Sequence, residues 1–104
     1  MENKMLECNK KRWAVITPNY YKAQNIIEDI EKSCGKIPSK KTLGNHKMVT
    51  EFTDGTILKW IYMPESLRAY KFGKMWCDES IDKEILDCII LPRYFGKYEE
   101  IIWV

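Results

Sequence analysis

Apolar residues recur at every third or fourth position between residues 23 and 34, which is the spacing of one face of an α-helix. The stripe consists of Ala23, Ile26, Ile27, Ile30 and Cys34. Thr17 suits the N-cap position, Pro18 suits the first helical position, and Gly35 suits the residue that ends a helix. The sequence therefore predicts a helix over residues 18–33.

The segments on either side of this helix have different patterns. The apolar run Trp13-Ala14-Val15-Ile16 predicts a strand that is buried on both faces. Tyr20 and Tyr21 fall in the first helical turn, where free backbone N–H groups can receive an anion. The alternative for these two tyrosines is ordinary packing at the start of the helix. Residues 1–11 are expected to be a frayed start or a short edge strand, and residues 36–46 a loop.

Two β-rich runs, residues 48–53 and 56–62, are joined by Asp54-Gly55, a pair that suits a two-residue type I′ turn. Such a turn would pair Phe52 with Ile57 and would direct one apolar face of the hairpin toward the helices. That face would carry Met48, Phe52, Ile57 and Ile61. The opposite face would carry Val49, Leu58 and Trp60.

The last third of the chain predicts one more strand, a second helix and a final strand. Residues 75–77 read as the strand, and Ser80 as the N-cap of a helix that Pro92 ends. Residues 99–104 read as the final strand. The order β-α-β-hairpin-β-α-β predicts a single α+β domain over residues 1–104, with one largely antiparallel sheet of about five strands and two helices.

Composition excludes several classes of protein. The net charge of +2 is too small for a typical duplex-DNA binder. The four cysteines form no Cys-x-x-Cys pair, and the single histidine, His46, is expected at the surface, so the sequence indicates neither zinc nor another cofactor. No run is apolar enough to span a membrane, and the N-terminus does not resemble a signal peptide. We therefore expect reduced thiols and a cytoplasmic location.

Two loops combine basic and aromatic residues, namely residues 68–74 and residues 93–97. Guanidinium groups bind phosphate oxygens, and aromatic rings stack on bases. This composition favours a pocket for a phosphorylated, base-containing ligand, with Asp78 accepting from ribose hydroxyls. The predicted ligand-binding residues are Arg68, Tyr70, Lys71, Phe72, Asp78, Arg93 and Tyr94. The alternative is that the loop aromatics pack into the core.

Motifs for catalysis are missing. The chain has no Gly-x-x-x-x-Gly-Lys-Ser/Thr loop and no Gly-x-Gly-x-x-Gly motif. Residues 75–79 have the outline of a Walker B strand, although Asp78 and Glu79 also suit the start of a helix. We therefore predict that the protein is not an enzyme.

Several of these stretches, in this order, resemble the ATPase domain of phage large terminases. They are Val15-Ile16-Thr17-Pro18 with the following helix, Asp54-Gly55-Thr56, Arg68-Ala69-Tyr70-Lys71-Phe72 and Trp76-Cys77-Asp78-Glu79. The resemblance covers most of residues 13–80 and implies a nucleotide-binding or DNA-binding module. The chain lacks the family's Walker A loop and has Ala69 where the family has glycine, so the resemblance does not extend to ATP hydrolysis.

The size, the predicted architecture and the loop chemistry are also similar to the small phage anti-Thoeris sponge proteins. That family implies a compact homo-oligomer, dimeric or larger, which sequesters a cyclic ADP-ribose-type or cyclic oligonucleotide immune signal in the host cytoplasm without degrading it. The resemblance gives Trp60 and Trp103 an oligomer interface to occupy. A third possibility is a protein-interaction module that inhibits a host enzyme through its tryptophan-bearing faces.

Overall fold

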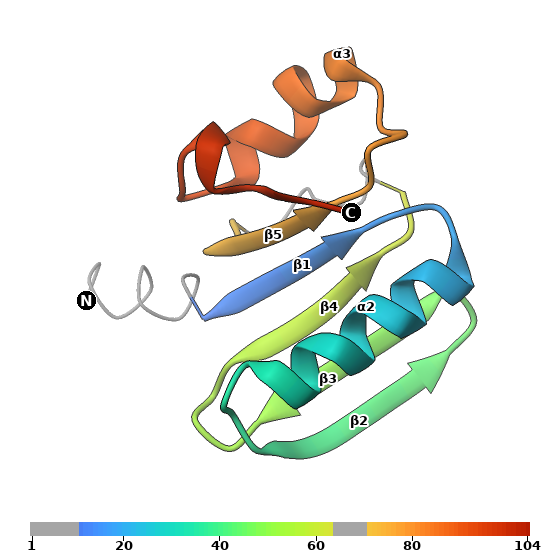
Figure 1. The fold of residues 1–104 in the computed structure, drawn as a ribbon, viewed down its shortest axis with the longest axis vertical. Coiled ribbons are helices and arrows are strands. Elements are labelled where there is room, and N and C mark those ends of the chain that lie inside the picture. The colour runs from blue at the N-terminus through green and yellow to red at the C-terminus, as the bar shows by residue number, and fades with distance from the viewer. Residues whose placement is uncertain (1–10, 64–70) are drawn as a thin grey trace.

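The computed structural model describes residues 11–63 and 71–104, and in them a mixed sheet lies between two helical segments (Figure 1). The strands are β1 (Arg12–Ile16), β2 (Pro38–Gly44), β3 (Lys47–Phe52), β4 (Ile57–Ile61), β5 (Lys74–Cys77) and β6 (Ile102–Trp103). The helical elements are α2 (Tyr20–Ser33), α3 (Lys83–Ile85), η2 (Leu86–Ile90), η3 (Leu91–Arg93) and η4 (Tyr98–Glu100).

The six strands lie in the order β2-β3-β4-β1-β5-β6. β2, β3 and β4 are antiparallel neighbours, whereas β4, β1, β5 and β6 are parallel to one another. The predicted α+β class with two helices is confirmed, but the sheet is mixed and not largely antiparallel. The reason is that β1 lies between β4 and β5, and long crossover connections make all three strands run the same way.

The sheet has one strand more than predicted, because β2 occupies a segment that was predicted to be a loop. β2 pairs with β3 along its whole length, from Pro38 opposite Phe52 to Gly44 opposite Lys47. It is an edge strand with mostly exposed side chains, so it lacks the alternation of apolar and polar residues that reveals a half-buried strand. The prediction of a loop over residues 36–46 was therefore wrong.

The helix α2 begins two residues later than predicted. Asn19 is the N-cap, because its side-chain oxygen accepts a hydrogen bond from the backbone N–H of Lys22. Thr17, which was predicted to be the cap, instead lies at the end of β1 and accepts a hydrogen bond from the N–H of Asn19. The apolar stripe of the helix faces the sheet, with Ala23, Ile27 and Ile30 buried.

The hairpin between β3 and β4 has a different register from the predicted one. Glu51 lies opposite Ile57, and the N–H of Phe52 donates to the carbonyl of Thr56, so three residues form the turn. A three-residue turn commonly ends with a residue at positive φ, and Gly55 has φ of 91°. The Asp54 carboxylate stabilises the longer turn by accepting from the N–H of Thr56.

A register shift of one residue moves every side chain of a strand to the other face. Leu58 and Trp60 therefore lie under α2 beside Met48 and Phe52, whereas they were predicted on the opposite face. Ile61 belongs to the other core instead. Trp60 is only 2% exposed, so its ring is not available for the oligomer interface that the sequence suggested.

Two hydrophobic cores lie on opposite faces of the sheet. Val15 of β1 contributes to the core under α2, and its neighbours Ala14 and Ile16 contribute to the core under α3 and η2. The second helical segment is capped by Asp82 and not by the predicted Ser80, and it continues as the π-helical η2. The final strand is also shorter than predicted, because residues 98–100 form a 3₁₀ turn. Among the described residues, no helix is long and apolar enough to cross a membrane.

Candidate functional site

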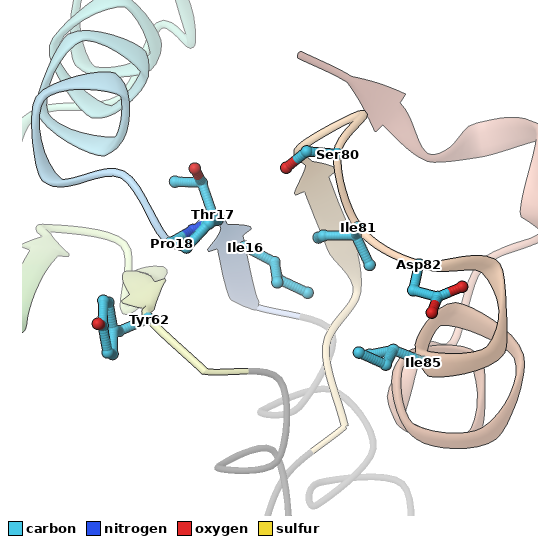
Figure 2. Close-up of a pocket in the computed structure, with 8 residues that line it drawn as sticks. All are labelled: Ile16, Thr17, Pro18, Tyr62, Ser80, Ile81, Asp82 and Ile85. Carbon is cyan, nitrogen blue, oxygen red and sulfur yellow. The ribbon is translucent and has the colours of Figure 1, made fainter.

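A pocket of about 250 Å³ lies where the parallel strands β4, β1 and β5 end. α2 follows β1 on one face of the sheet, and α3 follows β5 on the other (Figure 1). Helices that leave adjacent parallel strands toward opposite faces open a crevice between the strand ends, and this is where open α/β sheets bind ligands. The pocket is lined by Ile16, Thr17, Pro18, Tyr62, Ser80, Ile81, Asp82 and Ile85. In Figure 2, Tyr62 stands across the pocket from Ile81 and Ile85.

Asp78 follows β5 beside this pocket and is held by three groups. Its carboxylate accepts from the Thr17 hydroxyl at 2.6 Å and from the Ser80 N–H at 2.9 Å, and it lies 3.3 Å from the Lys22 ammonium. Burial alone would raise the pKa of Asp78, but the hydrogen bonds from Thr17, Ser80 and Lys22 outweigh it and lower this pKa to about 2. Asp78 is therefore an anion that links the ends of β1 and β5 to the first turn of α2.

An aromatic cluster lies beside the crevice at the same edge of the sheet. The Trp60 indole N–H donates to the carbonyl of Thr17 at 2.8 Å, which fixes this ring beneath the start of α2. Tyr20, His46 and Tyr62 each pack against Trp60, with ring centroids 5.7, 6.3 and 5.7 Å away. The sequence indicated none of this grouping, because the four rings come from three separate segments.

Within the described residues, the two basic-aromatic loops come together at Phe72, but at the other end of the sheet. The N–H of Phe72 donates to the carbonyl of Arg93, and the N–H of Phe95 donates to the carbonyl of Phe72. Phe72 and Tyr94 are 4% and 9% exposed and belong to the core under α3, so neither ring offers an open face to a base. The alternative that the loop aromatics pack into the core therefore describes these two residues.

The remaining residues that were predicted to bind the ligand differ in exposure and in position. Lys71 is exposed, and its ammonium lies 5.5 Å from the centre of the Phe95 ring. Arg93 is half-buried at the end of η3. Arg68 and Tyr70 lie outside the described residues. Asp78 follows β5 whereas Phe72 precedes it, so a strand of roughly 13 Å separates Asp78 from the paired loops. Asp78 and the described loop residues among those predicted, Lys71, Phe72, Arg93 and Tyr94, therefore lie at opposite ends of β5.

The thiols and carboxylates of the described residues differ in burial and in the partners they have. Burial raises the pKa of the Cys77 thiol to about 12, so this group stays protonated near neutral pH. Cys34 and Cys88 are also free thiols. Within residues 11–63 and 71–104, no three His, Cys, Asp or Glu side chains are grouped as metal ligands would be. Asp78 already has its oxygens engaged by Thr17, Ser80 and Lys22, so it does not fit the role of a direct magnesium ligand.

Comparison of the chain with protein-family models, curated proteins and solved structures finds no match.

Proposed function

We propose that this protein is a non-catalytic binder of a nucleotide-derived ligand, and that the ligand occupies the crevice at the carboxyl ends of β4, β1 and β5. The observation that carries the proposal is the position of the pocket at the point where α2 and α3 leave the sheet toward opposite faces. The pocket has an apolar wall and a polar rim, which suits a base and its attached ribose (Figure 2).

The proposed roles fall to residues that line the pocket and to Asp78 and Lys22, which adjoin it through the contacts of Asp78 with Thr17 and Ser80. Tyr62 and Ile85 would enclose the base between them. Lys22 would hold a phosphate, because its side chain is partly exposed and its ammonium is oriented by Asp78 and by the carbonyl of Val104. Asp78 would act as the positioning residue for Lys22. At about 250 Å³ the pocket is smaller than the usual range for drug-sized ligands, so it would enclose one nucleoside and not a whole dinucleotide.

Binding without hydrolysis is compatible with two biological roles. The first is a module related to the phage large-terminase ATPase domain. In its favour, Thr17 and Asp78, which both belong to the stretches that resemble that family, meet through a 2.6 Å hydrogen bond at the ends of adjacent parallel strands. The second is a phage-encoded sponge that sequesters a nucleotide-derived immune signal in the host cytoplasm. In its favour, the crevice offers an apolar wall to a base and the nearby Lys22 ammonium to a phosphate.

Replacing Lys22 by glutamine tests the crevice. We expect Lys22→Gln to weaken binding of a fluorescent adenosine nucleotide about tenfold or more, because the phosphate loses its charged partner. Lys32→Gln is the matched control, since Lys32 is an exposed lysine in the last turn of the same helix. Equal affinity of the two variants in fluorescence anisotropy would refute the proposal.

The same purified protein can separate the two roles. Ligand released by heat after incubation with lysate from immune-activated cells is analysed by mass spectrometry. Recovery of an intact adenine-containing cyclic nucleotide would support sequestration. Binding of the fluorescent nucleotide or of DNA, with nothing recovered from the lysate, would support the terminase-like module. Consumption of the added nucleotide would contradict the non-catalytic reading of either role.

A further inference from the structure

A second pocket, of about 480 Å³, lies at the same edge of the sheet but is not part of the crevice described above. Its lining comes from the β2–β3 turn, from the end of β4 and from the two residues that follow β4. These residues are Asn45, His46, Lys47, Lys59, Trp60, Ile61, Tyr62 and Met63. Lys59 and Trp60 point to opposite faces of β4, so the pocket lies at the end of the sheet, where residues of both faces border it.

One side of this pocket is formed by two stacked aromatic rings, on which a base could stack. The His46 and Tyr62 rings are parallel, with an interplanar angle of 0° and centroids 4.2 Å apart. His46 is exposed, and the buried Trp60 ring packs edge-on against both rings. The stack therefore presents an exposed histidine ring, packed against Tyr62 and Trp60, to a flat ligand.

The backbone of His46 is unusual in a way that favours a role for its ring. Its φ is 52°, and among the described residues no other non-glycine residue has a positive φ. Gly44 pairs with Lys47, so Asn45 and His46 form a two-residue turn. Glycine would adopt this conformation without steric cost, whereas histidine adopts it against a steric penalty.

The same pocket carries two positive charges. Lys47 and Lys59 are exposed, and neither forms an ion pair within the described part of the chain. The ion-paired lysines that the structure describes, Lys22, Lys36 and Lys41, lie elsewhere. An aromatic face beside two uncompensated ammonium groups matches a base that carries a phosphate.

We propose that this pocket binds a nucleobase that carries a phosphate, either as a free nucleotide or as one unit of a single-stranded nucleic acid. The base stacks on the His46–Tyr62 pair, and Lys47 and Lys59 neutralise the phosphate. The site does not depend on the crevice function, because Lys22 and Asp78 take no part in it. Tyr62 borders both pockets, so the decisive variants replace the lysines.

The test measures fluorescence anisotropy of a fluorescein-labelled twelve-residue thymidine oligonucleotide over a range of salt concentrations. We expect the double variant Lys47→Gln/Lys59→Gln to reduce the slope of log K against log salt by about 0.7 or more, because the site neutralises a phosphate and each neutralised single-strand phosphate contributes about 0.7. We expect His46→Gly/Tyr62→Leu to weaken binding roughly tenfold or more through lost stacking. Lys40→Gln, which removes an exposed lysine of β2 outside the pocket, should leave both quantities unchanged.

Competition with unlabelled ligands identifies the source of the bound unit. If thymidine monophosphate displaces the labelled oligonucleotide at about the same concentration as the unlabelled oligonucleotide does, the natural ligand is a free nucleotide. If only the unlabelled oligonucleotide displaces it, the natural ligand is a single strand. The proposal is overturned if the wild type binds neither, if the lysine variant keeps the wild-type salt slope, or if a twelve-base-pair duplex competes equally well. The two proposals can fail separately, because Lys22→Gln tests the crevice whereas Lys47→Gln/Lys59→Gln tests the pocket beside the aromatic stack.

Discussion

Asp78 shows how one side chain can combine structural and electrostatic roles. It lies 61 residues from Thr17 in the chain, yet the hydrogen bond between them joins the ends of two adjacent strands. It also orients Lys22, the residue to which we assign phosphate binding. The sequence predicted Asp78 as an acceptor for ribose hydroxyls. It could not predict Thr17 and Lys22 as partners, because a pattern of residues does not specify which strand ends become neighbours.

The low pKa of Asp78 leads to a prediction about stability and pH. The pKa of this carboxylate is about 2 in the folded protein, against an ordinary aspartate value of 3.8, so its ionised form stabilises the fold above pH 4, and this contribution is lost as the pH falls toward 2. The contribution is on the order of 2 kcal/mol, since one pKa unit corresponds to about 1.4 kcal/mol. In urea unfolding at several pH values, Asp78→Asn should therefore be less stable at pH 6 than the wild type and should lose less stability between pH 4.5 and 2.5.

The control for this experiment is Asp87→Asn, because Asp87 is exposed on η2 and forms no ion pair within the described residues. The free energy of unfolding of Asp87→Asn should change with pH as that of the wild type does. If the free energy of unfolding of Asp78→Asn also changes with pH as in the wild type, the Asp78 carboxylate does not have the lowered pKa that its contacts imply.

At the scale of helices and strands, the sequence predicted those elements whose pattern lies within one contiguous stretch of residues. The helix α2 and the β3–β4 hairpin were both predicted, because an apolar stripe of period 3.6 and an Asp-Gly turn are properties of contiguous residues. The register of the hairpin was missed by one residue, since Asp54 accepts from Thr56 and lengthens the turn. The edge strand β2 was missed because its side chains are mostly exposed and only its pairing with β3 defines it.

Because Gly55 ends the three-residue turn with a positive φ, a side chain at this position would strain the backbone and lower the stability of the fold. Its φ of 91° is one that L-residues adopt only with strain, although a Cβ there would meet nothing closer than the Lys11 ammonium at 4.0 Å. We expect Gly55→Ala to lower the free energy of unfolding by about 1–2 kcal/mol through backbone strain alone. Gly44→Ala is the matched control, because Gly44 has no positive φ and its Cβ would make an ordinary contact with Lys47. Equal stability of the two variants in urea unfolding would show that the turn is not the one described.

At the scale of the whole molecule, the sheet separates two cores, and the central strands contribute to both. Ala14, Val15 and Ile16 of β1 are completely buried, and so is Cys77 of β5. Phe72 and Asp78, two residues of the predicted site, lie apart for a reason at this scale, because they flank the same strand and must lie at its two ends. The crevice and the aromatic stack could not be predicted, since both depend on the order of the strands in the sheet.

Because Cys77 is buried, the rate at which its thiol reacts with a reagent reports how often the whole fold opens. In a variant with Cys8, Cys34 and Cys88 replaced by serine, the remaining thiol of Cys77 should react with a disulfide reagent only when the sheet opens. Its labelling rate should therefore be at least a thousandfold below that of an unfolded control, given the usual range of unfolding free energies. A variant that keeps only Cys88, which is exposed, should label within seconds. Rapid labelling of Cys77 in the absence of denaturant would contradict its position in the core.

The central position of β1 also has a consequence for the order of events during synthesis. β1 is translated before every other strand, but both of its neighbours in the sheet, β4 and β5, are translated much later. α2 and the β2–β3–β4 meander can begin to form while the chain is still growing, because their partners are near in sequence. The contact between Thr17 and Asp78 must wait until three quarters of the chain has left the ribosome. A nascent chain that is released early would therefore contain a helix and a hairpin but no binding crevice.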